Sequence, residues 1–221
     1  MQIRTGHALR TACAALLLLD ICEASYSCPE YSEIRQPSVS SKMFNISSFG
    51  GTWYMVATTE PTMPPFCTCS HNDVQIHELE GWYAYTSHAT CEGKIPISVP
   101  VKGELSKDPS SPGLLHENFG LFNHTMSSLD PNMIFEAQYN ERGEMVLAMT
   151  YACLGRLLPV PPIGEPKFSF NVLSRRRNWT TSDLREVVAN ATKATQGLLD
   201  VANVRFADQQ TYDSCASDIT V

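Results

Sequence analysis

The sequence of 221 residues lacks the features that mark several classes of protein. Its apolar run at residues 12–19 is far shorter than the ~20 residues of a membrane-spanning helix, and no second run approaches that length. Acidic residues outnumber basic ones and give the chain a formal net charge of −7. Its basic cluster, at residues 175–177, holds only three arginines. Nucleic-acid-binding proteins have the opposite balance. We therefore expect no transmembrane segment and no nucleic-acid partner.

The usual motifs of catalysis are also missing. No serine or cysteine lies in a recognisable nucleophile motif, and Gly50-Gly51 lacks the strand and helix context of a phosphate-binding loop. The sequence has no internal repeat and no domain linker. Residues 28–221 are therefore expected to form a single domain.

Residues 1–27 have the organisation of a secretory signal peptide. Arg4 and Arg10 precede the short apolar run, and small residues at Ala24, Ser25 and Ser27 fit cleavage after residue 24 or 27. We therefore expect a secreted, extracellular protein or one of the secretory-pathway lumen. Four glycosylation sequons agree with export and predict a glycoprotein; they are Asn45, Asn123, Asn178 and Asn190.

Six cysteines remain after such a cleavage: Cys28, Cys67, Cys69, Cys91, Cys153 and Cys215. An even number of cysteines in an exported chain predicts three disulfides, although spacing alone leaves the pairing open. The spacing Cys67-x-Cys69-x-His71 also resembles a short metal motif. Because export favours disulfides, we expect no metal site.

Most of the chain alternates apolar and polar residues with the two-residue period of β-strands. In one example, Val74 and Ile76 face one way while Asp73, Gln75 and His77 face the other. Turn residues separate the strands without intervening helices, so neighbouring strands should be antiparallel. Eight such strands close into an up-and-down β-barrel wide enough for one small ligand. The predicted strands are residues 53–60, 69–79, 82–91, 95–105, 114–122, 133–139, 145–153 and 167–175.

Other segments carry signals of their own. Residues 28–48 are expected to be an irregular arm and residues 124–132 a polar loop. Pro96 and Pro100 predict an edge or a loosely paired strand. An amphipathic helix is predicted over residues 182–196.

The residues at the two ends of the predicted barrel resemble those of the lipocalin family. Gly51-x-Trp53 matches the family's first motif, and the last strand ends in Leu173-Ser174-Arg175, like the family's third motif. The resemblance spans residues 28–215 and implies an all-β fold, an eight-stranded antiparallel barrel over residues 50–175 with one C-terminal helix. It implies Trp53 and Arg175 as a structural pair at the closed end, and no cofactor.

The cysteines resemble those of the apolipoprotein D-like lipocalins. That resemblance implies bonds between Cys28 and Cys153 and between Cys69 and Cys215, and it leaves Cys67 with Cys91. The last pair would join two loops at the open end of the barrel. A disulfide-tethered tail would then run to residue 215.

Two stretches, residues 60–67 and 107–115, resemble the lipocalin domain of violaxanthin de-epoxidase. The acid that this domain carries after its first strand is absent between Met63 and Cys69, so its enzymatic activity is not expected here. An enzyme acting on a carotenoid-like or lipid ligand is the alternative, and it needs an acid inside the barrel. Glu136 is the candidate.

The function that the resemblance implies is binding and transport of a small hydrophobic ligand: a carotenoid, retinoid, fatty acid or sterol. The candidate ligand contacts are apolar side chains of predicted strands; they are Met55, Ala57, Val74, Trp82, Phe135, Leu147, Met149 and Phe170. Two proline-rich loops at the barrel mouth form a lid, pack on each other, or offer a surface to a protein partner or a membrane. Their apolar residues are Met63, Phe66, Leu157, Leu158, Val160 and Ile163.

Overall fold

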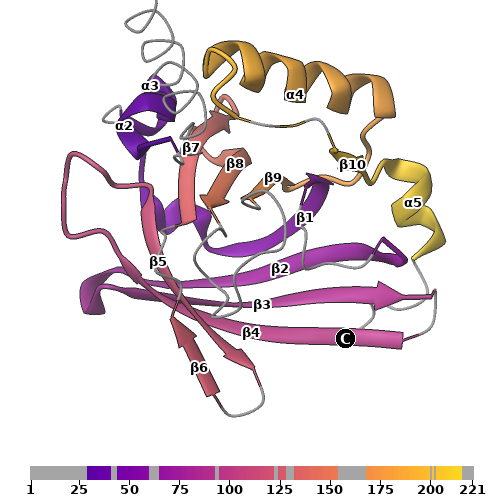
Figure 1. The fold of residues 1–221 in the computed structure, drawn as a ribbon, viewed down its shortest axis with the longest axis horizontal. Helices are drawn as coiled ribbons and strands as arrows, with labels where there is room; N and C mark the ends of the chain where they lie inside the picture. Colours follow the sequence, from indigo (N-terminus) through magenta and orange to yellow (C-terminus); the bar gives the residue numbers. More distant parts are fainter. Residues whose placement is uncertain are drawn as a thin grey trace, which may run out of the picture.

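In a computed structural model of the chain, one antiparallel sheet closes on itself as a barrel (Figure 1). β1 (Gly51–Thr58) closes it, because β1 pairs with β2 (Cys67–His77) on one side and with β9 (Phe168–Ser174) on the other. The remaining barrel strands are β3 (Trp82–Cys91), β4 (Ile95–Leu105), β5 (Leu114–Leu121), β7 (Asn132–Tyr139) and β8 (Met145–Cys153). The structure describes residues 29–40, 44–59, 65–92, 95–121, 124–127, 132–153, 168–199, 201 and 203–215.

The predicted fold class is confirmed: eight antiparallel strands close the barrel in sequence order, and a helix follows them. Two expectations about the connections were wrong. The arm before the barrel is helical in part, with α2 (Tyr31–Ile34), α3 (Pro37–Ser40) and η1 (Ile46–Phe49). The expected polar loop after β5 contains β6 (His124–Ser127), which pairs back onto β5. The tail adds β10 (Arg205–Phe206) and α5 (Gln209–Ser214).

The prolines of β4 lie where the strand has one described neighbour. β4 pairs with β3 along its whole length but with β5 only from Val101 to Leu105. Pro96 and Pro100 precede that paired part, so their missing N–H groups cost no hydrogen bond to β5 there. The predicted edge is confirmed for this half of the strand.

The strand register identifies the barrel interior. Trp53 lies opposite Asn72 of β2, and both are buried. Two residues along β2, Val74 lies opposite Tyr85 of β3, which in turn lies opposite Val101 of β4. Because opposite residues share a face and alternate residues return to it, these five side chains line the interior.

The other face of β2, β3 and β4 is open to solvent. It carries Asp73, Gln75, Thr86 and Lys102, of which only Thr86 is partly buried. The hydrophilic side chains predicted for β2 do point outward. We refer to this surface as the open outer face.

The outer face of β8 and β9 is covered instead. Tyr54 follows the inward tryptophan, so it points outward, opposite Ser174 of β9, which lies opposite Leu147 of β8. Ser174 is fully buried, and its Oγ accepts a hydrogen bond of 2.9 Å from the indole of Trp179. That tryptophan leads into α4 (Thr181–Ala194), which runs alongside β8 and β9 in Figure 1. We refer to this surface as the covered outer face.

The helix α4 forms where its sequence predicts. Thr180 accepts a hydrogen bond from the backbone of Asp183, whose carboxylate accepts one from the backbone of Thr180, a reciprocal capping box. Leu184, Val188 and Ala191 form its buried stripe. Among the described residues, no helix combines the length and the apolar character needed to cross a membrane.

Candidate functional site

The closed end of the barrel is plugged by Trp53 and Arg175. The guanidinium carbon lies 3.8 Å from the centre of the indole ring. The indole N–H donates a hydrogen bond of 2.7 Å to the carbonyl of Phe49. The predicted structural pair is therefore present, with its polar edge satisfied.

Arg175 also ties together the backbone that enters β1. Its guanidinium donates hydrogen bonds to the carbonyl oxygens of Ser48, Gly50 and Thr52. Gly51 has a φ of +95°, and a Cβ there would come within 2.9 Å of the guanidinium. Glycine is therefore required beside the cation. Burial lowers the pKa of Arg175 from its ordinary value to about 10.

The interior also carries a buried carboxylate, Glu117 of β5. It lies on the inner face because its partner Gly103 lies opposite Tyr83, whose ring fills the space that a Cβ of Gly103 would need. The hydroxyl of Tyr83 donates to Glu117 over 3.0 Å, and the amide of Asn132 donates over 2.9 Å. Burial, and secondly the charge of Glu117, raises the pKa of Tyr83 well above its ordinary value.

A second polar group lies on the inner face of β1, β8 and β9. The side-chain oxygen of Asn171 accepts a hydrogen bond of 2.6 Å from Thr58. Its amide donates to Ser169 over 2.9 Å and lies 3.4 Å from the hydroxyl of Thr150. These side chains are buried. The interior is therefore a mixed surface rather than a purely apolar one.

Two inward amides retain acceptors without a partner. The side-chain oxygens of Asn72 and Asn132 are buried and accept no hydrogen bond within the described part of the chain. A buried carbonyl oxygen without a donor costs about 1–3 kcal/mol. A ligand that brings a donor into the barrel would recover part of that cost.

The predicted ligand contacts divide between the two faces of the wall. Met55 lies opposite Leu173 on the inner face and joins Val74 there. Leu147 lies on the covered outer face, and the strand period places Met149 and Phe170 on it too. All three are buried, and they do not line the interior.

The remaining predicted contacts also lie away from the interior. Ala57 follows a β-bulge and pairs with Val172, on the covered outer face. Phe135 packs on Phe170, with ring centres 6.2 Å apart. Trp82 lies on the open outer face, because it pairs with His77. The polar lining was missed, although Glu117 stands two residues from the inward Leu115 and so follows the same alternation.

Comparisons with known proteins support this architecture. No protein-family model and no curated protein sequence matches the chain. Among solved structures, apocrustacyanin A1 of lobster has a TM-score of 0.57 at 17% identity, over 86% of this chain and 94% of its own. Insecticyanin of the tobacco hornworm Manduca sexta has a TM-score of 0.59 at 16% identity, over 82% of this chain and 86% of its own. The chain has the lipocalin fold.

The end of this lipocalin barrel opposite the Trp53–Arg175 plug carries two disulfides. Cys67 is bonded to Cys91 across β2 and β3, and Cys69 is bonded to Cys215 after α5, as predicted. The predicted bond from Cys28 to Cys153 involves a residue outside the described ranges. The two bonds anchor one strand to its neighbour and to the tail.

Apolar side chains are exposed at this end of the lipocalin barrel. Phe66 is 55% exposed, and Ile95 and Ile97, near the start of β4, are 54% and 42% exposed. The backbone of Phe66 accepts a hydrogen bond from Glu92, so the first loop reaches the β3–β4 turn. The other predicted mouth residues lie outside the described ranges: Met63, Leu157, Leu158, Val160 and Ile163.

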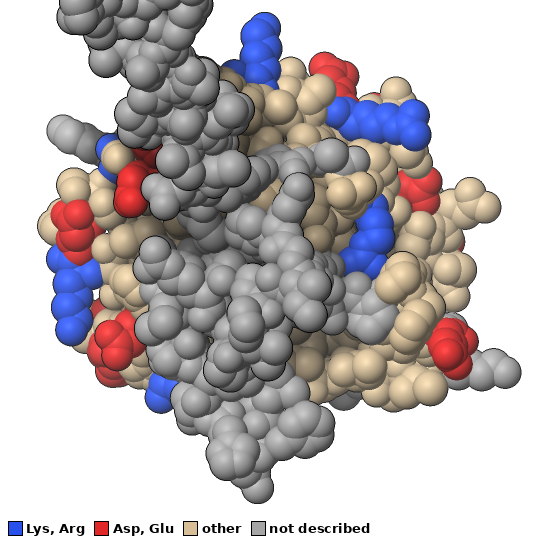
Figure 2. All heavy atoms as spheres, in the orientation of Figure 1, with Lys and Arg blue, Asp and Glu red and all other residues tan. Residues whose placement is uncertain are grey.

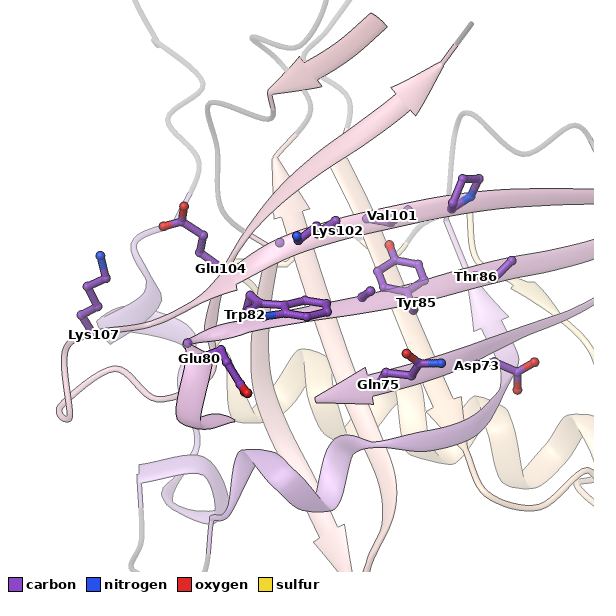
Figure 3. Close-up of a pocket in the computed structure, with 14 residues that line it drawn as sticks. Asp73, Gln75, Glu80, Trp82, Tyr85, Thr86, Val101, Lys102, Glu104 and Lys107 are labelled. Atoms are coloured by element: carbon purple, nitrogen blue, oxygen red, sulfur yellow. The ribbon is translucent and has the colours of Figure 1, made fainter. Parts of the chain in front are cut away.

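The open outer face bears a shallow hollow of about 780 Å³ (Figure 3). At its centre the ring of Trp82 stacks on His77 with ring centres 3.6 Å apart, and the Lys102 ammonium lies 4.4 Å from the indole. Charged groups of both signs surround it, among them Glu104 and Lys107 (Figure 3). Trp82 thus contributes to the outside of the lipocalin barrel.

The acid predicted for an enzyme lies on the covered outer face. Glu136 pairs with Met149, and burial raises the pKa of its carboxyl. One of its oxygens is buried without a partner in the described part of the chain. Among the described residues, the carboxylate that lies on the inner face of the barrel is that of Glu117.

Proposed function

We propose that this lipocalin is secreted and that it binds and carries a small, largely apolar molecule with a neutral hydroxyl group. The observation that carries the proposal is the lining of the interior. Val74, Tyr85 and Val101 line the interior, and the inward amide oxygens of Asn72 and Asn132 accept no hydrogen bond from any described residue. This lining matches an apolar body that ends in a hydrogen-bond donor.

The free energy of burying apolar surface is large enough to make the apolar body of the ligand the main source of affinity. Burying about 300 Å² of apolar ligand surface at ~25 cal/mol per Å² supplies roughly 7 kcal/mol. That free energy corresponds to a dissociation constant of about 10 μM. Hydrogen bonds to the amide oxygens then select among ligands of similar size.

The buried acid favours a neutral head group over an anionic one. A fatty-acid carboxylate in the barrel would meet the like charge of Glu117, which Tyr83 and Asn132 hold in place. Retinol, a sterol or a hydroxylated carotenoid supplies a donor without that repulsion. Among the ligand classes expected for the family, the alcohols therefore fit best.

Direct titration tests this choice. The oxidised, folded protein is titrated with retinol, cholesterol, a hydroxylated carotenoid and a fluorescent fatty acid, and native mass spectrometry gives the stoichiometry. We expect one equivalent of an alcohol to bind and to displace the fatty acid. Asn72→Leu should weaken alcohol binding about tenfold, the loss expected for one buried hydrogen bond. Equal binding by Asn72→Leu, or a preference for the fatty acid, would contradict the proposal.

The proposal that the protein is secreted and glycosylated rests on its sequence and on the exposure of its sequon asparagines. Asn45, Asn178 and Asn190 are exposed, and Asn123 lies outside the described residues. Two disulfides fit an oxidising compartment. Expressed in a eukaryotic cell line, the full chain should be recovered from the medium and shift to lower mass on glycosidase treatment. Retention inside the cell without any such shift would reject this part.

Turnover of the ligand is a second candidate, favoured by the buried carboxylate of Glu117 inside the barrel. After prolonged incubation the bound ligand is extracted and analysed by chromatography. Recovery of unchanged ligand supports carriage. Conversion that disappears in Glu117→Gln, with ligand binding retained, would instead support an enzyme.

A further inference from the structure

Three potential metal ligands lie together on the open outer face, away from the barrel interior. His71 of β2 lies directly opposite His88 of β3, and Asp73 lies two residues further along β2 on the same face. One ligand atom from each residue lies within 4.8 Å of the other two. Asp73 is exposed and both imidazoles are partly exposed, so an ion in solution has access to them.

The spacing of these groups fits one bound ion. Two imidazoles on a single ion, with metal–nitrogen bonds of about 2.0–2.1 Å, place their ring centres roughly 4.5–5.3 Å apart. The rings of His71 and His88 are stacked, with centres 4.7 Å apart and planes inclined by 18°, so their separation matches and a rotation of the rings would direct both Nε2 atoms at one ion. Donor atoms on a tetrahedral ion lie about 3.3 Å apart. The His88 Nε2 atom lies 3.5 Å from Asp73 Oδ2.

The remaining polar atom of each ligand is held by a neighbour. His88 Nδ1 lies 2.9 Å from the hydroxyl of Ser98, and His71 Nδ1 lies 3.4 Å from the carbonyl of Cys69. Asp73 Oδ1 accepts a hydrogen bond of 2.6 Å from Thr52. Such outer partners orient ligands in metal sites. Here they leave the two Nε2 atoms and Asp73 Oδ2 for an ion.

We propose that His71, His88 and Asp73 bind one divalent transition-metal ion, of the kind represented by Zn²⁺, with a fourth position open to water. Two imidazoles and one carboxylate suit Zn²⁺, Cu²⁺ or Ni²⁺ better than Ca²⁺ or Mg²⁺, which prefer oxygen ligands. The site differs from the Cys67-x-Cys69-x-His71 pattern, because both cysteines are in disulfides. It is independent of the ligand proposed for the barrel.

The test uses the secreted, disulfide-bonded protein without a histidine tag, after removal of metal with a chelator. Zn²⁺ is titrated by calorimetry, and native mass spectrometry gives the stoichiometry. We expect one Zn²⁺ per chain, and affinity at least about tenfold lower in His71→Gln, His88→Gln and Asp73→Asn. His77→Gln and His116→Gln change histidines outside the cluster and should bind like the wild type.

A second measurement needs no variant and therefore does not depend on their folding. In the ¹⁵N-histidine spectrum of the wild-type protein, Zn²⁺ should shift the Nε2 resonances of His71 and His88 and leave that of His116 in place. Absence of saturable Zn²⁺ binding would overturn the proposal. So would equal loss of affinity in His116→Gln, or equal shifts of all histidines.

Discussion

The two outer faces of the barrel differ in what lies over them. On the covered outer face, Leu147 and Phe170 are fully or almost fully buried. On the open outer face, Gln75 and Lys102 are exposed. Both faces belong to the same closed sheet, so the strands of one barrel have two different environments. The covered face contributes to stability, whereas the open face presents the histidine cluster and the hollow around Trp82.

This difference explains which site residues the sequence predicts. Where one face of a strand meets solvent, alternation separates inside from outside, and in β2 it places Val74 inward and Asp73 outward as expected. In β8 and β9 both faces are buried, so apolar residues such as Leu147 and Phe170 give no sign of their direction. The comparison can be tested by substitutions on each face.

The largest effect is expected on the covered outer face. Phe170→Ala should lower the free energy of unfolding by about 3–5 kcal/mol, because it leaves a cavity where the ring packs against Phe135. Chemical denaturation followed by circular dichroism measures the loss. Gln75→Ala on the open outer face is the control and should change stability by less than about 0.5 kcal/mol, because Gln75 is exposed. Similar losses in the two variants would remove the distinction between the faces.

A smaller loss is expected at the closed end. Arg175→Ala should cost about 2–3 kcal/mol, because several backbone carbonyls lose a charged donor and Trp53 loses its cover. Arg176 also lies over a ring, that of Trp179, but it is exposed. Arg176→Ala should cost under about 1 kcal/mol. The same denaturation curves compare the two arginines, and equal costs would show that burial of Arg175 adds nothing.

Alkaline pH should weaken the attachment of the arm to β7. Burial raises the pKa of Tyr31 to about 12. Between pH 10 and 12 the unfolded phenol loses its proton and the folded one keeps it, so stability falls as pH rises. The contribution of Tyr31 should be about 1.3 kcal/mol smaller at pH 11 than at pH 9. Tyr31→Phe should therefore show a flatter fall over this range, and an unchanged slope would contradict the assignment.

The smallest effect is expected for Trp82 on the open outer face. Its contacts with His77 and Lys102 are partly exposed, so Trp82→Ala should cost about 1 kcal/mol. Binding of the barrel ligand should not change, because the ring lies outside. Retinol titration of the folded variant provides that measurement. If Trp82→Ala lost as much retinol affinity as a variant of the interior does, Trp82 would belong to the ligand site.

The sequence predicts the barrel well because local residue patterns indicate where its strands begin and end. Turn residues such as Gly143, with a φ of +76°, and capping residues such as Thr180 determine where elements begin and end. Gly51 and Trp53 form the closed end because they are close in sequence, and Arg175 was found through its motif. The histidine cluster depends on the pairing of His71 with His88, which links positions far apart in the chain. Prediction of such a site requires the register in which two strands pair, and the alternation of apolar and polar residues within one strand does not provide it.

The most direct test of the account compares two neighbours on β4. Val101 is buried on the inner face, and Lys102 is exposed on the outer one. Val101→Phe should fill the interior and weaken retinol binding by about tenfold or more, whereas Lys102→Phe should bind like the wild type. Fluorescence titration of the two folded variants with retinol measures both affinities. Weaker binding by Lys102→Phe together with unchanged binding by Val101→Phe would place the ligand outside the barrel and contradict the account.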